Sequence, residues 1–279
     1  MSEERKTKKL IKKKTVSGKF SGARIVDEAK KNYFSLFPDD DSLRTLIPNS
    51  FVINRPMNAV GGDGYWVHKA ENCYYLVIFD CMGHGHLASM MTRVYTNVIK
   101  TTIEGNEDEF PNRMLMDIHE EIKSKFEGKE NIILGTGADF GIVKINLDLS
   151  EMEYAGARMN LFEVTDGNLN LIKADRMQIG DLFDYHHEYK TNIIALREKS
   201  QSSFYLLSDG VKDLIGGPNN RKLGSSRLKE LLEQASKYDM PKQKQYISNY
   251  LSVWKGSNQA LDDALIIGFN LPKSFFGRA

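Results

Sequence analysis

The chain has 279 residues, of which 41% are hydrophobic, and its 38 basic and 37 acidic side chains leave a formal net charge of +1. Its length and apolar content suffice for one large domain or two small ones, and the balanced charge gives no indication of a nucleic-acid partner. No apolar stretch approaches the roughly 20 residues that span a bilayer, and no apolar segment follows the basic start to make a signal peptide. We therefore expect a cytoplasmic protein without a transmembrane segment, and its two cysteines, Cys73 and Cys81, agree with a reducing compartment.

The beginning of the chain divides into three segments. Residues 1–20 are rich in lysine and arginine, and we interpret them as a basic, disordered tail. Residues 21–37 are predicted to form an amphipathic helix whose apolar side chains recur every four residues, at Ile25, Ala29, Tyr33 and Phe37. The stretch that follows, up to residue 50, contains two prolines and an acidic run and is predicted to be a connector.

From residue 51 to residue 272 the pattern predicts a single domain, which leaves 273–279 as a C-terminal tail. Strand-like segments come in runs, and helical spacing appears in two blocks, one after "GHGH" and one after "SDG". Asp166 and Gly167 between two short strands predict a tight hairpin turn. Because strands and helices do not alternate, we expect an α+β domain in which antiparallel sheets are covered by helices.

Five aspartates stand at the ends of predicted core strands. Asp63 lies in "GGDG", Asp80 ends "YYLVIFD", Asp209 ends "SFYLLSD", and Asp262 and Asp263 begin "DDALIIGF". An ionised carboxylate at the edge of a core is costly unless a cation compensates it, and converging carboxylates make an oxygen-rich site that suits Mg²⁺ or Mn²⁺. The alternative is that each aspartate only ends a strand, since Asp-Gly is a common turn pair. That simpler reading is favoured for any one aspartate alone and is less attractive for all of them together.

An ordered set of segments resembles a known family, the PPM or PP2C-type metal-dependent protein phosphatases, and within it the bacterial SpoIIE/RsbU-like branch. The matching pieces span residues 58–268 and occur in the family's order. They are "NAVGGDGYW", "FDCMGHG", "GADFGIVKINL", "YAGA", "LLSDGVKDLI", "KLGSSRLKELL" and "DDALIIG". The resemblance implies a four-layer αββα sandwich of antiparallel sheets with a centre of two Mn²⁺ or Mg²⁺ ions at one edge.

The resemblance also implies a role for individual residues. Asp80 matches the carboxylate that bridges both metals, and the main-chain carbonyl of Cys81 completes the coordination of one of them. Asp209 and Asp262 match the other ligands of the first metal, and Asp63 matches the acidic position that serves the second. The implied catalytic residues are therefore Asp80, Asp209 and Asp262.

Four further residues have secondary roles in this comparison. Asp213 matches an acidic residue associated with a weaker third metal in some members, and Asp263 could support the ligands from behind. Where many relatives have Ala-Gly-His, this chain has Ala-Gly-Ala followed by Arg158, so a third-metal aspartate is missing there and Arg158 becomes a candidate phosphate contact. His84 is offset from a histidine proposed as general acid in some eukaryotic members, and its flanking glycines favour a loop residue.

These features predict a soluble bacterial serine/threonine phosphoprotein phosphatase. Two divalent ions lower the pKa of a shared water, which then attacks the phosphoryl group without any protein nucleophile. By resemblance, the expected substrate is a STAS-type anti-sigma-factor antagonist in a partner-switching pathway. A non-catalytic PP2C-like binding module and a metal-dependent hydrolase of small phosphoesters remain as alternatives. The helix over residues 23–37 either pairs with a second copy, giving a homodimer, or packs on its own domain in a monomer.

Overall fold

The computed structural model describes residues 22–83, 85–127, 136–181, 188–196 and 201–276. The predicted basic tail and His84 lie outside these ranges, as do the last three residues of the predicted C-terminal tail. No helix in the described ranges is both long enough and apolar enough to cross a membrane.

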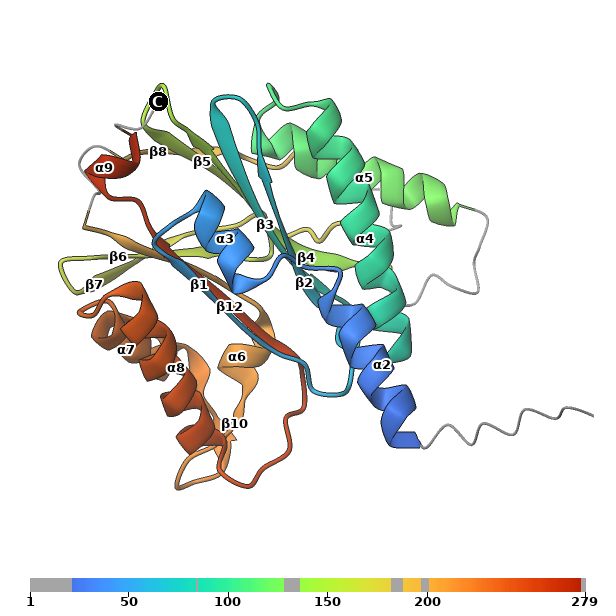
Figure 1. Ribbon diagram of the computed structural model, residues 1–279, viewed down its shortest axis with the longest axis vertical. Coiled ribbons are helices and arrows are strands. Elements are labelled where there is room, and N and C mark those ends of the chain that lie inside the picture. Colours follow the sequence, from blue (N-terminus) through green and yellow to red (C-terminus); the bar gives the residue numbers. More distant parts are fainter. Residues whose placement is uncertain (1–21, 84, 128–135, 182–187, 197–200, 277–279) are drawn as a thin grey trace, which may run out of the picture.

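Two five-stranded antiparallel sheets form the centre of the molecule (Figure 1). In spatial order, the first sheet contains β1 (Ser50–Arg55), β12 (Ala264–Asn270), β9 (Ser203–Leu207), β6 (Leu161–Thr165) and β7 (Asn168–Ile172). The second contains β2 (Asp63–Lys69), β3 (Cys73–Cys81), β4 (Ala138–Asn146), β5 (Glu151–Ala157) and β8 (Asn192–Ala195). The short strands β10 (Ile215–Gly216) and β11 (Arg221–Lys222) pair separately.

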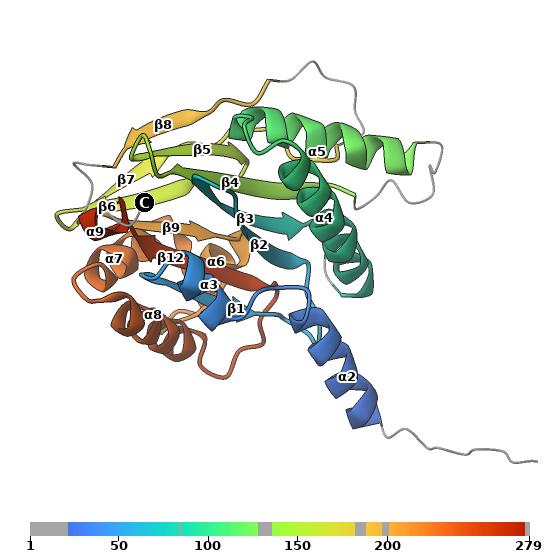
Figure 2. The same ribbon diagram turned by 45° about the horizontal axis from the view of Figure 1, so that its top comes forward.

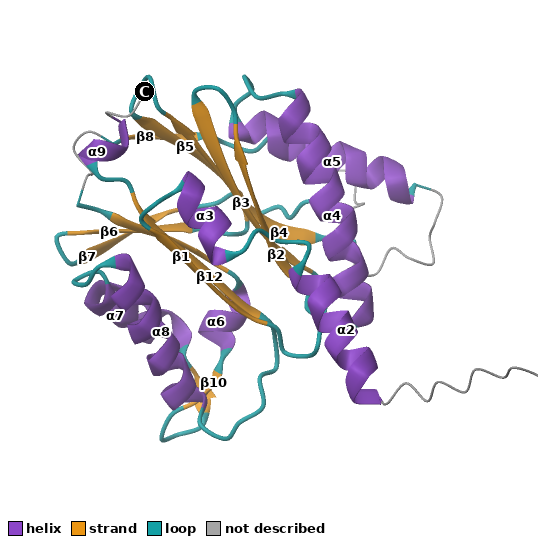
Figure 3. Cartoon of the chain, in the orientation of Figure 1, coloured by secondary structure: helices purple, strands orange, loops and turns teal. Residues whose placement is uncertain are grey.

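Helices cover the outer face of each sheet, so the molecule has four layers (Figure 2). The second sheet is covered by α4 (His86–Gly105) and α5 (Pro111–Phe126), and the first by α7 (Gly224–Ala235) and α8 (Met240–Lys255). The remaining helices are α2 (Gly22–Phe34), α3 (Asp40–Leu46), α6 (Asp209–Asp213) and α9 (Lys273–Phe276). The predicted α+β sandwich of antiparallel sheets is confirmed, and Figure 3 shows how the helices and strands segregate into layers.

Side-chain alternation divides the interior into two cores. Along β12, Leu265, Ile267 and Phe269 belong to the core that includes the strands of the second sheet, whereas Ile266 belongs to the core under α7 and α8. This is the period of two expected of a strand that is buried on both faces. In β3, residues 75–79 are completely buried, which explains why that segment is apolar on both sides in the sequence.

The predicted hairpin at Asp166 and Gly167 is also confirmed. Both residues have positive φ, 51° and 77°, and Thr165 pairs directly with Asn168. Two central residues with positive φ define the type I′ turn, whose twist matches that of the flanking strands. This turn joins β6 and β7 at the edge of the first sheet.

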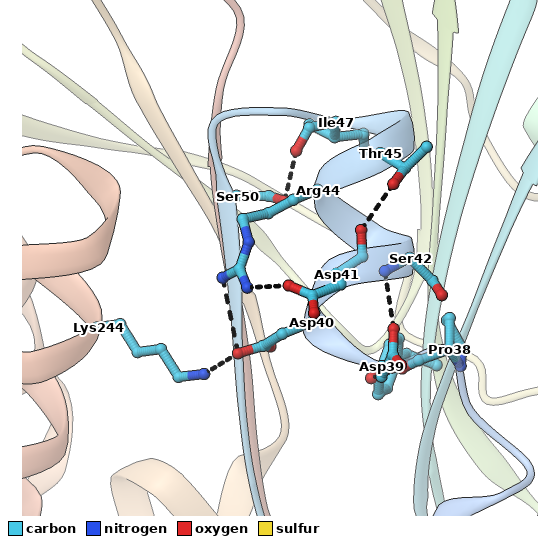
Figure 4. Close-up of polar contacts among 11 residues, drawn as sticks. Pro38, Asp39, Asp40, Asp41, Ser42, Arg44, Thr45, Ile47, Ser50 and Lys244 are labelled. Atoms are coloured by element: carbon cyan, nitrogen blue, oxygen red, sulfur yellow. Dashed lines mark hydrogen bonds and ion pairs between the residues drawn. The ribbon is translucent and has the colours of Figure 1, made fainter.

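The stretch predicted to be a connector contains the helix α3, which the acidic run itself begins (Figure 4). The carboxylate of Asp39 accepts a hydrogen bond from the main-chain N–H of Ser42 at 2.8 Å, the arrangement of a helix N-cap. Asp40 and Asp41 then lie in the first turn, where the helix dipole favours negative charge. Asp40 also pairs with Lys244 of α8, so α3 is tied to the helical layer over the first sheet.

The predicted N-terminal helix is shorter than expected and docks only at its C-terminal end. It ends at Phe34, but the predicted stripe continues into the core because Tyr33 and Phe37 are both buried. The ring of Phe37 stacks on Tyr65 of β2, with 5.3 Å between ring centroids. Further toward the N-terminus Ile25 is 55% exposed, and α2 extends away from the body (Figures 1 and 2).

Candidate metal centre

Three carboxylates form a row across the second sheet. Asp63 of β2 lies directly opposite Asp80 of β3, and Asp80 lies directly opposite Asp139 of β4. Residues paired in this way on neighbouring strands project from the same face of a sheet. The strand register therefore places three acidic side chains side by side at the C-terminal end of β3.

The first sheet contributes two more carboxylates to the same region. Asp209 follows β9 and begins α6, and Asp262 precedes β12, the strand that pairs with β9. Burial, and after it repulsion from Asp209, Asp262 and Asp139 in that order, raises the pKa of Asp80 to about 8. The charges of Asp209 and Asp262, at the ends of strands in the first sheet, thus act on Asp80 in the second.

Asp63 is completely buried and carries an oxygen without a partner. Its Oδ2 accepts a hydrogen bond from Ser208 Oγ at 2.6 Å, whereas Oδ1 has no hydrogen-bond partner among the described residues. Burial raises the pKa of this carboxyl well above its usual range, and the neighbouring Asp80 adds to the effect. Tyr33 of α2 donates a hydrogen bond to the main-chain oxygen of Asp63 at 2.6 Å, so the docked end of the helix contacts this position directly.

Asp263 and Asp213 have partners of their own. The carboxylate of Asp263 accepts hydrogen bonds from the main-chain N–H groups of Met57 and Gly62, each at 2.6 Å, and so holds the loop between β1 and β2. Asp213 pairs with Lys222 at 2.8 Å on the more exposed side of α6. Asp263 therefore supports the site from behind, and Asp213 occupies a separate surface contact.

Cys81 contributes its backbone rather than its thiol. The thiol is buried, and burial together with the charge of Asp80 raises its pKa well above the usual range, so it is not poised to ionise. A Cβ atom built on Gly62 would stand 2.9 Å from the carbonyl oxygen of Cys81. The glycine leaves room around this carbonyl, for which the resemblance implies a role as metal ligand.

The donor set fits a hard divalent cation. As the side chains stand, no three acidic, histidine or cysteine side chains in the described part of the chain converge closely enough to enclose an ion. However, the centre combines mutually repelling carboxylates with a buried, unpaired oxygen of Asp63, and a cation would compensate both. Carboxylate and carbonyl oxygens are the ligands that Mg²⁺ and Mn²⁺ prefer, so binding requires these side chains to close around the ion.

Gly210, the second residue of α6, lies against the main chain of Asp263, and substitution of this glycine tests the packing of the site. A Cβ atom at Gly210 would collide with the carbonyl oxygen of Asp263. We expect Gly210→Ala to lower the free energy of unfolding by about 1–3 kcal/mol and to weaken Mn²⁺ binding, measured by thermal melting and by calorimetric titration. Gly105→Ala at the end of α4, where a Cβ meets nothing within 4 Å, is the control. Wild-type melting and Mn²⁺ affinity in Gly210→Ala would show that this close approach is not required.

Asp139 is a further acidic residue of the centre that was not among the residues predicted from sequence, and it contacts Arg158, the candidate phosphate contact. Burial raises the pKa of Asp139 to about 6, and the guanidinium of Arg158 acts against this shift. Arg158 Nε lies 3.3 Å from Asp139 Oδ1. Asp139 lies in the matching segment "GADFGIVKINL", but the register that sets it opposite Asp80 could not be known before the fold.

Comparisons with solved structures identify the same architecture in phosphatases. The SiaA-PP2C domain of Pseudomonas aeruginosa is 26% identical to the chain, with a TM-score of 0.80 over 89% of this chain and 96% of that one. The RsbU and RsbW domains of Rv1364c from Mycobacterium tuberculosis match at 15% identity and a TM-score of 0.60, over 80% of this chain and 60% of that one.

A third structure of the same fold contains metal. It is the catalytic domain of the serine/threonine protein phosphatase PstP in complex with two manganese ions, with 13% identity and a TM-score of 0.52 over 78% of this chain and 96% of that one. No curated protein sequence matches the chain. A family model described as Stage II sporulation protein E (SpoIIE) matches residues 70–272, which is well over half of the chain and includes every strand from β3 onward. The chain therefore belongs to the SpoIIE family and carries a PP2C-type phosphatase domain.

Proposed function

We propose that the chain is a Mn²⁺- or Mg²⁺-dependent phosphatase that hydrolyses phosphoserine or phosphothreonine in a protein substrate. The observation that carries this proposal is that Asp80, buried in the second sheet, lies against the charges of Asp209 and Asp262 from the first. When bound at these carboxylates, two divalent ions would make a water-derived nucleophile available near neutral pH. A separate protein nucleophile is then unnecessary, which agrees with the buried, inert thiol of Cys81.

Each carboxylate has a defined part in this proposal. Asp80 would contribute to holding both ions. Asp209, Asp262 and the carbonyl of Cys81 would hold the first, and Asp63 would hold the second. Ser208 supports this arrangement because its hydroxyl donates to one oxygen of Asp63 and leaves the other for a cation. Asp263 and Asp213 remain secondary candidates.

The proposed substrate is a small phosphorylated regulatory protein of the STAS type, in a bacterial partner-switching pathway. Membership of the SpoIIE family and the similarity to a protein with RsbU and RsbW domains support this choice. Removing the phosphate restores a neutral serine or threonine, which can enter an interface that the charged group had blocked. Such a pathway is consistent with a cytoplasmic protein.

The substrate class is tested by comparing two kinds of phosphoester. We expect Mn²⁺-dependent phosphate release from a STAS-domain protein phosphorylated on serine to exceed that from ATP or a nucleoside monophosphate by at least about 100-fold in kcat/KM, which corresponds to about 2.7 kcal/mol. The same reactions in EDTA are the control. Faster turnover of the free nucleotides would identify a hydrolase of small phosphoesters instead.

Two further questions are whether the chain is a non-catalytic binding module and whether it forms a homodimer. A non-catalytic binding module would be expected to have lost a ligand, whereas Asp80, Asp209 and Asp262 are all present and brought together. Homodimerisation through residues 23–37 stays a prediction, which the molar mass in solution decides. The exposed side chains of Ile25 and Phe34 on α2 are available for such a contact.

A further inference from the structure

We propose that Arg158 positions the substrate's phosphate, and that the hollow beside it accepts an apolar residue next to the phosphorylated serine or threonine. The proposal rests on the function proposed above and names a specificity determinant of the same site. It assigns the chain's preferred substrate as a phosphorylated side chain with an apolar neighbour.

The backbone at Arg158 is held in a conformation that arginine rarely adopts. Its φ is +61°, in the left-handed region. The main-chain N–H of Arg158 donates to the carbonyl oxygen of Asp175 at 2.7 Å, and the residue also bridges to Phe140 of β4, the neighbour of Asp139. A non-glycine residue in this region costs free energy, and such residues concentrate at functional sites. The strained backbone fixes the direction in which the arginine side chain leaves the sheet.

Two polar side chains hold the guanidinium at the edge of the metal centre. Arg158 Nε lies 3.3 Å from Asp139 Oδ1, and Nη1 donates to Gln178 Oε1 at 3.0 Å. A guanidinium has five N–H groups in a planar fork, so further donors remain for a ligand. The Arg158 side chain is 49% exposed, which keeps it accessible to a phosphoprotein.

The charges around Asp139 place this guanidinium beside the metal ligands. The positive charges of Arg158 and Lys212 lower the pKa of Asp139, and the negative charge of Asp209 raises it. Asp139 therefore interacts with both Arg158 and Asp209, the residue that we assign to the first metal. The positive charges of Arg158 and Lys212 would complement the charge of a phosphate that binds beside Asp209.

A hollow of about 310 Å³ adjoins these groups. Its lining includes the charged side chains of Arg158, Asp209 and Lys212 and the apolar side chains of Phe162, Leu169 and Leu171. Leu171 is 38% exposed, so part of the apolar lining is open to an incoming chain. A hollow lined by both apolar side chains and a few charged groups is typical of a site that orients a ligand with one charged and one apolar part.

The experiment measures kcat, KM and Mn²⁺ affinity for Arg158→Asn and Arg158→Lys with a phosphoserine peptide that has leucine beside the phosphoserine. Asparagine is chosen because it tolerates positive φ, so the backbone is preserved while the charge is removed. We expect Arg158→Asn to lower kcat/KM about 10- to 100-fold, the loss typical of a charged hydrogen bond, without weakening Mn²⁺ binding. Arg158→Lys recovers part of this loss. Arg113→Ala, an exposed residue on α5, is the control and keeps wild-type kinetics.

A second peptide with glutamate in place of the leucine tests the hollow. We expect the wild type to prefer the leucine peptide by about 10-fold in kcat/KM, roughly the value of burying one aliphatic side chain. A kcat/KM for Arg158→Asn within twofold of wild type, or equal turnover of the two peptides, overturns the respective half of the proposal.

Failure of the proposed function has a different signature. If the wild type binds Mn²⁺ and releases no phosphate from either peptide, the phosphatase assignment fails. Arg158 is then judged by the fluorescence anisotropy of the labelled leucine phosphopeptide, measured on wild type and Arg158→Asn. Weaker binding to the variant supports the anion-binding role, and equal or absent binding to both proteins overturns it.

Discussion

Asp209→Asn is expected to reduce Mn²⁺-dependent phosphate release by at least about 100-fold, a loss comparable to or larger than that from disturbing residues behind a metal ligand. Asp209 begins α6 shortly after β9, and its charge raises the pKa of both Asp80 and Asp139. Asparagine has nearly the same shape and removes one negative charge, so the packing is preserved while cation affinity falls. Phosphate release at saturating phosphopeptide, with and without Mn²⁺, measures the effect.

The matched control is Asp166→Asn, which makes the same chemical change in the hairpin between β6 and β7. Asparagine suits its positive φ of 51°, so the turn is retained and activity stays at the wild-type level. Circular dichroism and thermal melting establish that both variants are folded. Full activity in a folded Asp209→Asn protein would exclude Asp209 as a metal ligand and with it the proposed arrangement of the first metal.

The predictions from sequence succeeded where the signal lay within one short segment of the chain. The apolar run that ends at Asp80 has to be buried on both faces, which makes it a central strand whatever the rest of the fold. Asp166 and Gly167 favour a type I′ turn through their own backbone preferences. Helices at "GHGH" and after "SDG" follow from spacing within a single segment. In each case the signal depends on neighbouring residues alone.

Features set by contacts between distant segments could not be predicted. Asp139 joins the carboxylate row only because β4 pairs with β3 in a register that places it opposite Asp80. The resemblance implied a supporting role for Asp263, but not its contacts, which are with the N–H groups of Met57 and Gly62 in a loop some 200 positions earlier. Two prolines and the acidic run at residues 39–41 predict a connector. In the structure Asp39 instead caps the N-terminus of α3.

Asp80→Asn is expected to have opposite effects on stability with and without metal. In the metal-free wild type the pKa of Asp80 is about 8, compared with 3.8 for the free side chain. Between these values the folded state binds a proton that the unfolded state has released, so the free energy of unfolding falls as the pH rises from about 4 to 8. Asp63 acts in the same direction, since its pKa is also raised. Asparagine at position 80 removes the part of this penalty that Asp80 contributes.

The expected result is a crossing of melting temperatures. In EDTA at pH 8, Asp80→Asn melts above the wild type, and its melting temperature changes less between pH 5.5 and pH 8. With Mn²⁺ at about 100 times its dissociation constant, the wild type gains about 2.7 kcal/mol, or roughly 5–10 °C for a domain of this size, and the variant gains little. Thermal melting of both proteins across this pH range, in EDTA and in Mn²⁺, measures all four conditions. A variant that melts below the wild type in EDTA at pH 8 would mean that Asp80 is already stabilised without a cation. The proposed role of Asp80 in holding both metal ions would then be unsupported, because a carboxylate that the protein alone stabilises gains little free energy from binding metal.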